Sequence, residues 1–156
     1  MGGAGSRAMS RVDFAFGAAD RLRMACEVVR KHYLSGRHLI VYTQDKQRLA
    51  RFDRLLWGFD PEAFVPHVQA DDPLAAQTSV LLTATEPMPA PQAGPPPWLI
   101  NLDLQCPPGA ERFERILEIV SGHEDDKNAA RQRWREYQQA GHDLHAHDVS
   151  PKDTGA

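Results

Sequence analysis

Hydrophobic and polar positions follow two different periods along the first third of the chain. Residues 12–16 alternate apolar and polar, the pattern of a half-buried strand, whereas residues 38–43 form an apolar run typical of a strand covered on both faces. Between these segments apolar residues recur at helical spacing after Asp20, and Asp45 precedes a second amphipathic segment. The pattern therefore predicts strand, helix, strand and helix in succession.

The remainder of the chain continues the alternation. Residues 79–83 and 98–102 are apolar and predict two further strands, separated by an extended loop, residues 86–97, that contains six prolines. Residues 110–120 place Phe113, Ile116, Leu117 and Val120 at helical spacing and predict an amphipathic helix. The expected fold class is α/β, a single-domain sandwich with a mainly parallel central sheet.

Length and composition indicate one globular domain. The chain has 156 residues, of which 42% are hydrophobic and 25% charged. We expect a disordered N-terminal extension over residues 1–10, with Met9 as an alternative start, a domain over residues 11–148, and a flexible tail over residues 149–156.

Charge, cysteine content and missing motifs exclude several function classes. A net charge of -3 argues against a protein that binds nucleic acid directly. With only two cysteines, a disulfide framework is not expected, which suits a reducing cytoplasm. No run is long enough to span a membrane, and no glycine-rich phosphate loop or G-x-S-x-G elbow occurs. We expect no enzyme, no cofactor and no metal, and we interpret the His-rich residues 142–147 as polar rather than metal-binding.

A cationic and aromatic cluster near the C-terminus is the first candidate binding site. On a helix that begins after the acidic residues 124–126, Lys127, Arg131, Trp134 and Arg135 share one face. Three cations beside an indole can hold a carboxylate and a ring together. The alternative is a solvated helix whose tryptophan faces the core.

A second candidate lies where the second helix runs into a proline-bearing loop. Trp57, Phe59 and Phe64 are close in sequence there, and aromatic residues in such loops often anchor protein interfaces. The alternative is a loop pinned to the core by its rings.

At these two segments the chain resembles a known family, the chi subunit of the bacterial DNA polymerase III holoenzyme. The resemblance covers residues 12–148. Its most specific parts are Leu56-Trp57 with Phe64-Val-Pro-His67, and Glu124-Asp-x-Lys127-x-x-Ala130-Arg131-x-Arg133 with Tyr137 and Ala140-Gly141.

The resemblance implies a cytoplasmic adaptor without catalytic activity, built on a mononucleotide-binding fold that lacks a working nucleotide site. It implies a psi-subunit surface at Trp57 and Phe64, a surface for which a helicase-type protein competes in the family. It also implies a site for the acidic C-terminal tail of single-stranded DNA-binding protein at Val120, Lys127, Arg131, Trp134 and Arg135. Trp134 and Arg135 depart from the family, which has tyrosine and lysine there.

These partners would couple the clamp loader to coated template, so contact with DNA would be indirect and no membrane would be involved. Two alternatives remain open. A direct single-stranded DNA-binding accessory protein would use the cationic helix as part of a basic groove. A degenerate nucleotide-dependent enzyme would need a phosphate site that the sequence lacks.

Overall fold

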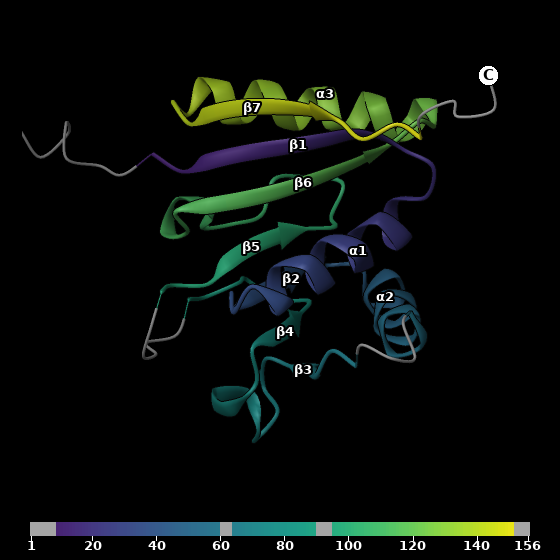
Figure 1. Cartoon of the computed structure of the whole chain (residues 1–156). Coiled ribbons are helices and arrows are strands. Elements are labelled where there is room, and N and C mark those ends of the chain that lie inside the picture. The colour runs from purple at the N-terminus through teal and green to yellow at the C-terminus, as the bar shows by residue number, and fades with distance from the viewer. Residues whose placement is uncertain (1–8, 60–63, 90–94, 152–156) are drawn as a thin grey trace, which may run out of the picture.

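The computed structural model describes residues 9–59, 64–89 and 95–151, in which seven parallel strands form one sheet (Figure 1). The strands are β1 Arg11–Ala18, β2 Leu39–Tyr42, β3 His67–Gln69, β4 Val80–Thr83, β5 Trp98–Asn101, β6 Arg115–Ser121 and β7 Asp143–Asp148. The α-helices are α1 Arg21–Leu34, α2 Lys46–Gly58 and α3 Glu124–Gln139. Short 3₁₀ turns lie at η2 Ala75–Gln77 and η3 Ala110–Arg112. The expected α/β class with a parallel sheet is confirmed.

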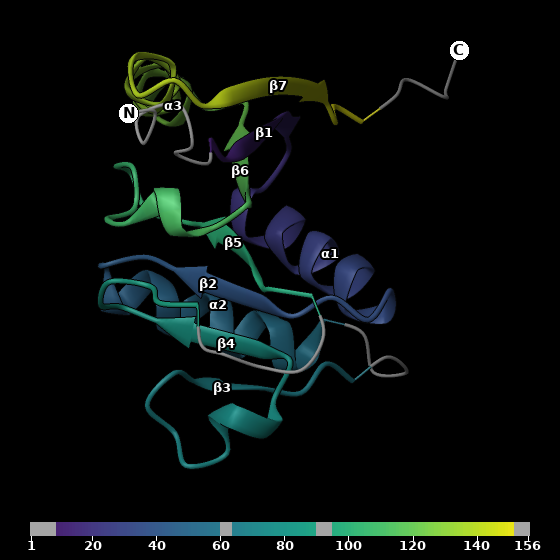
Figure 2. The same ribbon diagram turned by 90° about the vertical axis from the view of Figure 1, so that its left-hand side faces the viewer.

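The order of strands across the sheet is β3-β4-β2-β5-β6-β1-β7. Helices α1 and α2 pack together on one face of the sheet, and α3 covers β6 and β7 on the opposite face (Figures 1 and 2). The end of α2 therefore lies towards the β3 edge, whereas α3 lies at the β7 edge.

Local sequence signals set the helix ends. The Asp20 carboxylate accepts a hydrogen bond from Arg23 N, and Asp45 accepts from the backbone N–H groups of Gln47 and Arg48, so both predicted N-caps are confirmed. Gly141 has φ +89° just beyond α3, a left-handed conformation that glycine adopts without strain.

The predicted helix over residues 110–120 is wrong. Only η3 is helical there, and the apolar residues continue as strand β6, paired with β1 on one side and β5 on the other. A strand buried on both faces is apolar at consecutive positions, so Ile116, Leu117, Ile119 and Val120 satisfy the helical spacing and the strand equally well. The β-branched residues at three of these four positions favour the strand.

Besides β6, two further strands were not predicted. Strand β3 has only three residues and follows the proline-bearing loop, of which residues 60–63 lie outside the described residues. Strand β7 contains most of the His-rich segment, and its polar sequence gives no apolar signal because it is an edge strand.

The expected N-terminal extension and C-terminal tail lie largely outside the described residues, which exclude residues 1–8 and 152–156. Residues 90–94 of the proline-rich loop are also outside the described residues. Ser10, which we assigned to the N-terminal extension, is buried, and its hydroxyl donates to the carbonyl oxygens of Phe113 and Ala110.

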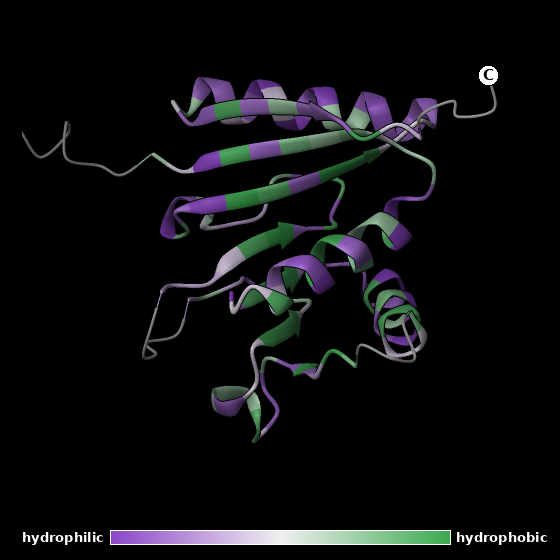
Figure 3. Cartoon of the chain, viewed as in Figure 1, coloured by the Kyte–Doolittle hydropathy of each residue, from purple (hydrophilic) through white to green (hydrophobic). Residues whose placement is uncertain are grey.

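The sheet has a hydrophobic core on each face. Figure 3 shows the contrast between the apolar strands β4 and β5 and the largely hydrophilic α3. Leu49, Phe52 and Leu56 of α2 lie in the core under α1 and α2, as their spacing predicted. Phe14, Ile116 and Tyr137 belong to the opposite core, under α3.

A polar cluster ties β1 to its two neighbours. The buried Asp13 carboxylate lies 3.1 Å from Arg11 Nε, 2.8 Å from Arg115 Nε and 2.8 Å from His147 Nε2. Burial opposes ionisation, but these hydrogen bonds outweigh it and lower the pKa of Asp13 to about 2. The edge strand β7 is therefore held to the sheet by side-chain contacts as well as by its backbone ladder.

Helix α3 is fixed to the sheet by a buried ion pair. Arg133 Nε donates to Glu118 Oε1 at 2.9 Å, with the two side chains 1% and 0% exposed. Tyr137 Oη and Asn101 Nδ2 donate to the other carboxylate oxygen, and Arg133 Nη1 donates to the Leu104 carbonyl. Burial and the nearby Glu118 charge raise the pKa of Tyr137 well above its ordinary value, so its hydroxyl remains a donor.

We expect Arg133→Ala to lower the free energy of unfolding by about 3–5 kcal/mol, because it leaves the Glu118 carboxylate buried without its cation. Urea unfolding followed by circular dichroism measures the change. Gln132→Ala, at the exposed neighbouring position, is the control and should stay within about 0.5 kcal/mol of the parent. A loss of less than about 1 kcal/mol for Arg133→Ala would mean that the pair does not hold α3 in place.

Candidate functional site

A groove of about 450 Å³ runs between α3 and the sheet, and all five residues predicted for tail binding line it. We call it the α3 groove; its lining consists of Phe14, Phe16, Val120, Lys127, Ala130, Arg131, Trp134, Arg135 and Ala146. The predicted sharing of one helix face by three cations and one indole is thus observed in the geometry. Val120 comes from strand β6 rather than from a preceding helix, which corrects our expectation for its element.

The floor of the α3 groove is apolar. Trp134 packs against Phe14 with ring centroids 5.1 Å apart, and Val120 and Ala130 are buried beside them. Phe16 is half-exposed at the mouth. Trp134 therefore combines both of our sequence interpretations, since one part of the ring joins the core cluster and the rest lines the groove.

The cations lie around this floor. Arg131 is exposed, and its Nη1 donates to Asn128 Oδ1 at 2.6 Å, while Lys127 Nζ lies 3.3 Å from Glu124 Oε1. An exposed pair such as Lys127 with Glu124 is weak, so the ammonium can exchange its partner for an incoming anion. The groove can thus accept an apolar or aromatic group whose neighbouring carboxylate meets a guanidinium.

Sequence reasoning missed the walls supplied by β1 and β7. Phe14 and Phe16 follow the period of two in β1, which places them on one face of the sheet. That signal was available, but it did not reveal which helix covers the face. Ala146 belongs to β7, whose register against β1 pairs it with Phe14. Because β7 was not predicted as a strand, this pairing could not be predicted either.

The second candidate surface consists of Trp57 and Phe64, and we call it the Trp57–Phe64 surface. The two rings lie 5.0 Å apart, and the residues are 50% and 57% exposed. Phe64 is therefore not a core ring. Phe59, which we had grouped with them, packs instead against the core under the Arg23 guanidinium.

A protein side chain lies beside the usual ligand crevice of an open α/β sheet. Such sheets bind ligands where neighbouring strands send their helices to opposite faces, here at the carboxyl ends of β1 and β6. The Arg21 guanidinium lies next to this place and donates to carbonyls of β6 and of the residues after β5: Ile119 at 2.8 Å, Leu102 at 3.1 Å and Asp103 at 2.9 Å. Guanidinium donors that are used by these carbonyls are not available to a phosphate.

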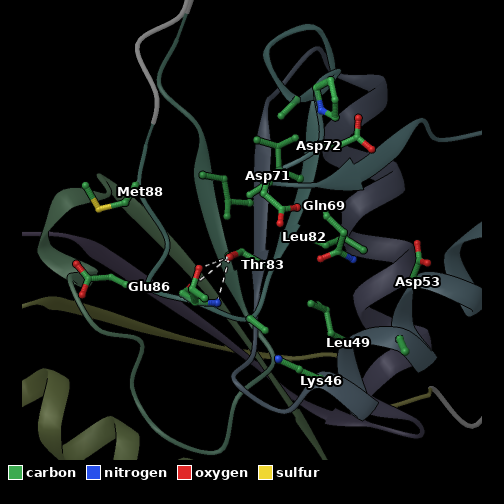
Figure 4. Close-up of a pocket in the computed structure, with 18 of the residues that line it drawn as sticks. Lys46, Leu49, Asp53, Gln69, Asp71, Asp72, Leu82, Thr83, Glu86 and Met88 are labelled. Atoms are coloured by element: carbon green, nitrogen blue, oxygen red, sulfur yellow. Dashed lines mark hydrogen bonds between the residues drawn. The ribbon is translucent and has the colours of Figure 1, made fainter.

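A larger hollow of about 1100 Å³ lies beside β3 and β4 and coincides with neither predicted site (Figure 4). Its walls include Leu49, Leu81 and Leu82, and Lys46 shares it with the carboxylates of Asp53, Asp71, Asp72 and Glu86. Size alone does not make it the functional site, because it lacks the convergent donors that the α3 groove has.

Neither cysteine has the lowered pKa of a reactive thiol. Burial raises the pKa of Cys26 to about 12, and burial together with a hydrogen bond that the thiol donates to the Glu136 carboxylate raises the pKa of Cys106 further. Among the described residues, no group of three or more metal-ligating side chains is assembled. Over the same residues, no helix is long and apolar enough to cross a membrane.

The chain is similar to a known protein family over most of its length. The model of the family described as DNA polymerase III chi subunit, HolC, matches residues 9–145. DNA polymerase III subunit chi of Pseudomonas aeruginosa is 33% identical over 148 residues, which cover 89% of this chain and 96% of the relative. The chi subunit of Escherichia coli is 25% identical, covering 78% of this chain and 81% of its own length, and that of Haemophilus influenzae is 23% identical, covering 81% and 85%.

We expect both thiols to react with a disulfide reagent at about pH 8 at least ~100-fold more slowly in the folded protein than in urea, since a raised pKa leaves little thiolate. Absorbance of the released thiol measures the two rates. Cys26→Ser and Cys106→Ser assign each phase. Fast labelling of either cysteine in the folded state would contradict the assignment of these thiols as inert.

Proposed function

This chain belongs to the DNA polymerase III chi subunit family, and on that premise we propose that it is a non-catalytic adaptor that binds two protein partners. Its role is that of a replication accessory protein. One partner is the acidic C-terminal tail of single-stranded DNA-binding protein, held in the α3 groove. The other is a psi-like subunit of the clamp loader, held on the Trp57–Phe64 surface. The compartment is the cytoplasm, where bacterial replication takes place.

One observation carries the tail assignment: the residues that the resemblance nominated lie around a single groove together with an apolar floor. A tail that ends in phenylalanine presents a ring and a terminal carboxylate on the same residue. The floor of Phe14, Val120 and Trp134 fits the ring, and Arg131 supplies a planar bidentate donor for the carboxylate. Acidic residues upstream would meet Lys127 and Arg135.

Affinity for one tail should be modest. A short linear contact that orders on binding gives an affinity of about micromolar strength. Several tails on one single-stranded DNA-binding protein oligomer would raise the effective affinity without new contacts.

The position of the second surface supports an adaptor role. The Trp57–Phe64 surface lies at the end of α2 near the β3 edge, whereas the α3 groove lies at the β7 edge of the same sheet (Figure 1). Two partners can therefore occupy the protein together. The exposed rings of Trp57 and Phe64 have the character of interface anchors.

The alternative of direct binding to single-stranded DNA has weaker support. Such proteins use a continuous basic groove with rings free to stack on successive bases. Trp134 is packed against Phe14, and the protein carries a net charge of -3. A nucleotide-dependent activity is disfavoured because the sequence has no glycine-rich phosphate loop and the Arg21 donors beside the strand ends are used by backbone carbonyls.

We expect a synthetic acidic peptide that ends in Pro-Phe to bind with affinity that falls as salt rises, and C-terminal amidation to weaken it by about 1.5–3 kcal/mol, the range for a hydrogen bond to a charged group. Fluorescence anisotropy measures both. Arg131→Ala should reproduce the effect of amidation and raise the off-rate, while Lys127→Ala should lower the on-rate at low salt.

Arg51→Ala is the matched control, because Arg51 is an exposed arginine on α2, distant from the groove. A labelled thymidine oligonucleotide replaces the peptide in a parallel titration. Unchanged binding after amidation would refute the carboxylate contact. Tight oligonucleotide binding that Arg131→Ala abolishes would favour the direct DNA-binding alternative.

We expect Phe64→Ala to abolish association with a purified psi-like subunit while changing acidic-peptide affinity by less than about 0.5 kcal/mol, because distant sites are usually uncoupled. Since Phe64 is more than half exposed, unfolding free energy should fall by less than about 1 kcal/mol. Calorimetry of both complexes and thermal unfolding measure these quantities. Phe59→Ala, which removes a ring that packs on the core, is the contrast and should destabilise the fold. Joint loss of both partners with a lower melting temperature would reassign Phe64 to the core.

A further inference from the structure

Strand β7 has a free edge. It pairs with β1 alone, and among the described residues no strand lies on its other side (Figure 1). Asp143 N donates to the Ser10 carbonyl at one end of β7, and Val149 N donates to the Phe16 carbonyl just beyond the other end. Because backbone groups alternate in direction along a strand, the odd-numbered residues of β7 direct their N–H groups to β1. The even-numbered residues therefore direct their N–H and C=O groups away from the sheet; they are Leu144, Ala146 and Asp148.

This free edge is continuous with the α3 groove. Ala146 lines the groove, and Leu144 packs against the core under α3, so the even-numbered side chains face α3. Ala146 thus offers its methyl group to the groove and its backbone groups to the edge. An extended chain that occupies the groove lies within reach of the outward backbone groups of β7.

The cations of α3 have the spacing of side chains on a strand. Lys127, Arg131 and Arg135 are four residues apart, so they follow one another along the helix in steps of about 6 Å. Side chains on one face of an extended strand repeat about every 6.8 Å. Since α3 runs alongside β7 (Figures 1 and 2), carboxylates at every second position of a strand added to β7 would each lie near one of these cations.

These cations are available to an incoming strand. Arg131 and Arg135 are exposed, and neither forms an ion pair with another described residue. Lys127 has only its weak exposed pair with Glu124. Acidic side chains would therefore gain partners without displacing a buried contact.

The anions of β7 lie at its two ends and have partners of their own. The Asp143 carboxylate is 2.9 Å from His145 Nε2, and the Asp148 carboxylate accepts from Ser150 N at 2.9 Å. Residues 144–147 between them carry no acidic side chain. Charges at the ends of an edge strand oppose unspecific pairing, whereas its middle remains open to an acidic chain.

We propose that the edge of β7 takes up an extended acidic peptide as an eighth strand of the sheet, with alternate carboxylates matched to Lys127, Arg131 and Arg135. Backbone hydrogen bonds to β7 would supply affinity, and the cation spacing would select acidic residues at every second position. The identity of the partner rests on the proposed tail site. The strand pairing itself requires only an acidic extended chain.

Hydrogen exchange of the backbone amides, followed by NMR in the full chain, tests the pairing. The probes are the acidic peptide that ends in Pro-Phe and the same peptide without its last two residues, both at saturating concentration. The amides of Leu144, Ala146 and Asp148 should exchange at least about tenfold more slowly in each complex than in the free protein. Those of His145 and His147 face β1 and are the internal control, slow in both states. Unchanged exchange at the even-numbered residues of a saturated complex would overturn the proposal.

Peptides with a single backbone N-methyl group test the ladder from the side of the ligand. A strand added to β7 donates from every second residue, so methylation at alternate positions upstream of Pro-Phe should weaken binding about fivefold. Methylation at the intervening positions should change it less than about twofold, which makes these peptides the matched controls. Fluorescence anisotropy measures the affinities. Equal effects at successive positions would contradict strand addition.

Two peptides of equal composition test the cation spacing, with aspartates at either the even or the odd positions before Pro-Phe. One of them should bind more tightly at low salt, and Arg135→Gln should weaken that peptide about threefold and leave the other unchanged. Arg51→Gln, on α2, is the control and should affect neither peptide. An equal loss for both peptides in Arg135→Gln would refute the spacing match.

The outcomes separate this inference from the proposed tail site. Binding that amidation weakens, without slower exchange at the even-numbered residues, would reject the inference alone. Slower exchange with both probes, without any effect of amidation, would reject recognition of the tail end and leave the strand pairing. Absence of binding by both probes would reject both. Even-numbered amides already protected in a free protein that sedimentation shows to be dimeric would assign the edge to a second copy and overturn the proposal.

Discussion

The buried pair between Glu118 and Arg133 is the constraint on which the rest of the binding region depends. Both charged side chains of the pair are buried, and such a pair is tolerated only when its hydrogen-bond geometry is good. The pair therefore permits only a narrow range of rotations of α3 on the sheet. Arg133 and Tyr137 point at Glu118, and this fixes the rotation of α3. The opposite side of the same helix surface then borders the space above β1 and β7 with Lys127, Arg131, Trp134 and Arg135. An apolar contact of the same size would allow α3 to rotate, and we infer that the ion pair is used here for orientation rather than for stability.

The same pair shows the limit of what the sequence predicts. Helices α1 and α2 were predictable because Asp20 and Asp45 act locally, and β2, β4 and β5 because strands covered on both faces are apolar at successive positions. Strand β6 obeys that rule as well, yet its apolar residues also fit a helix, and the decisive fact is its place between β1 and β5. Glu118 lies within that ambiguous segment, so its pairing with a residue on the following helix could not be foreseen.

The candidate site divides in a similar way. The cationic half of the α3 groove lies on one helix and follows from spacing alone, whereas Phe14, Phe16 and Ala146 reach it only through strand order and register. Strand β7 gives no apolar signal because it is an edge strand, held instead by the Asp13 cluster that includes His147. The histidines of residues 142–147, which resembled a metal motif in sequence, therefore include one whose partner is a carboxylate of the neighbouring strand.

The physical separation of the two surfaces has a consequence for how such an adaptor works. The α3 groove and the Trp57–Phe64 surface lie towards opposite edges of one parallel sheet, and the close-packed interior between them has low compressibility. Coupling between the partners would require an element with two discrete arrangements, and neither surface contains the other's residues. The two surfaces differ in character: the α3 groove has exposed cations at Lys127 and Arg131, whereas the Trp57–Phe64 surface consists of two aromatic rings in contact. An adaptor built in this way gains affinity for an assembly by holding two partners at a fixed distance, and salt can then weaken the attachment at the cationic groove while the other persists.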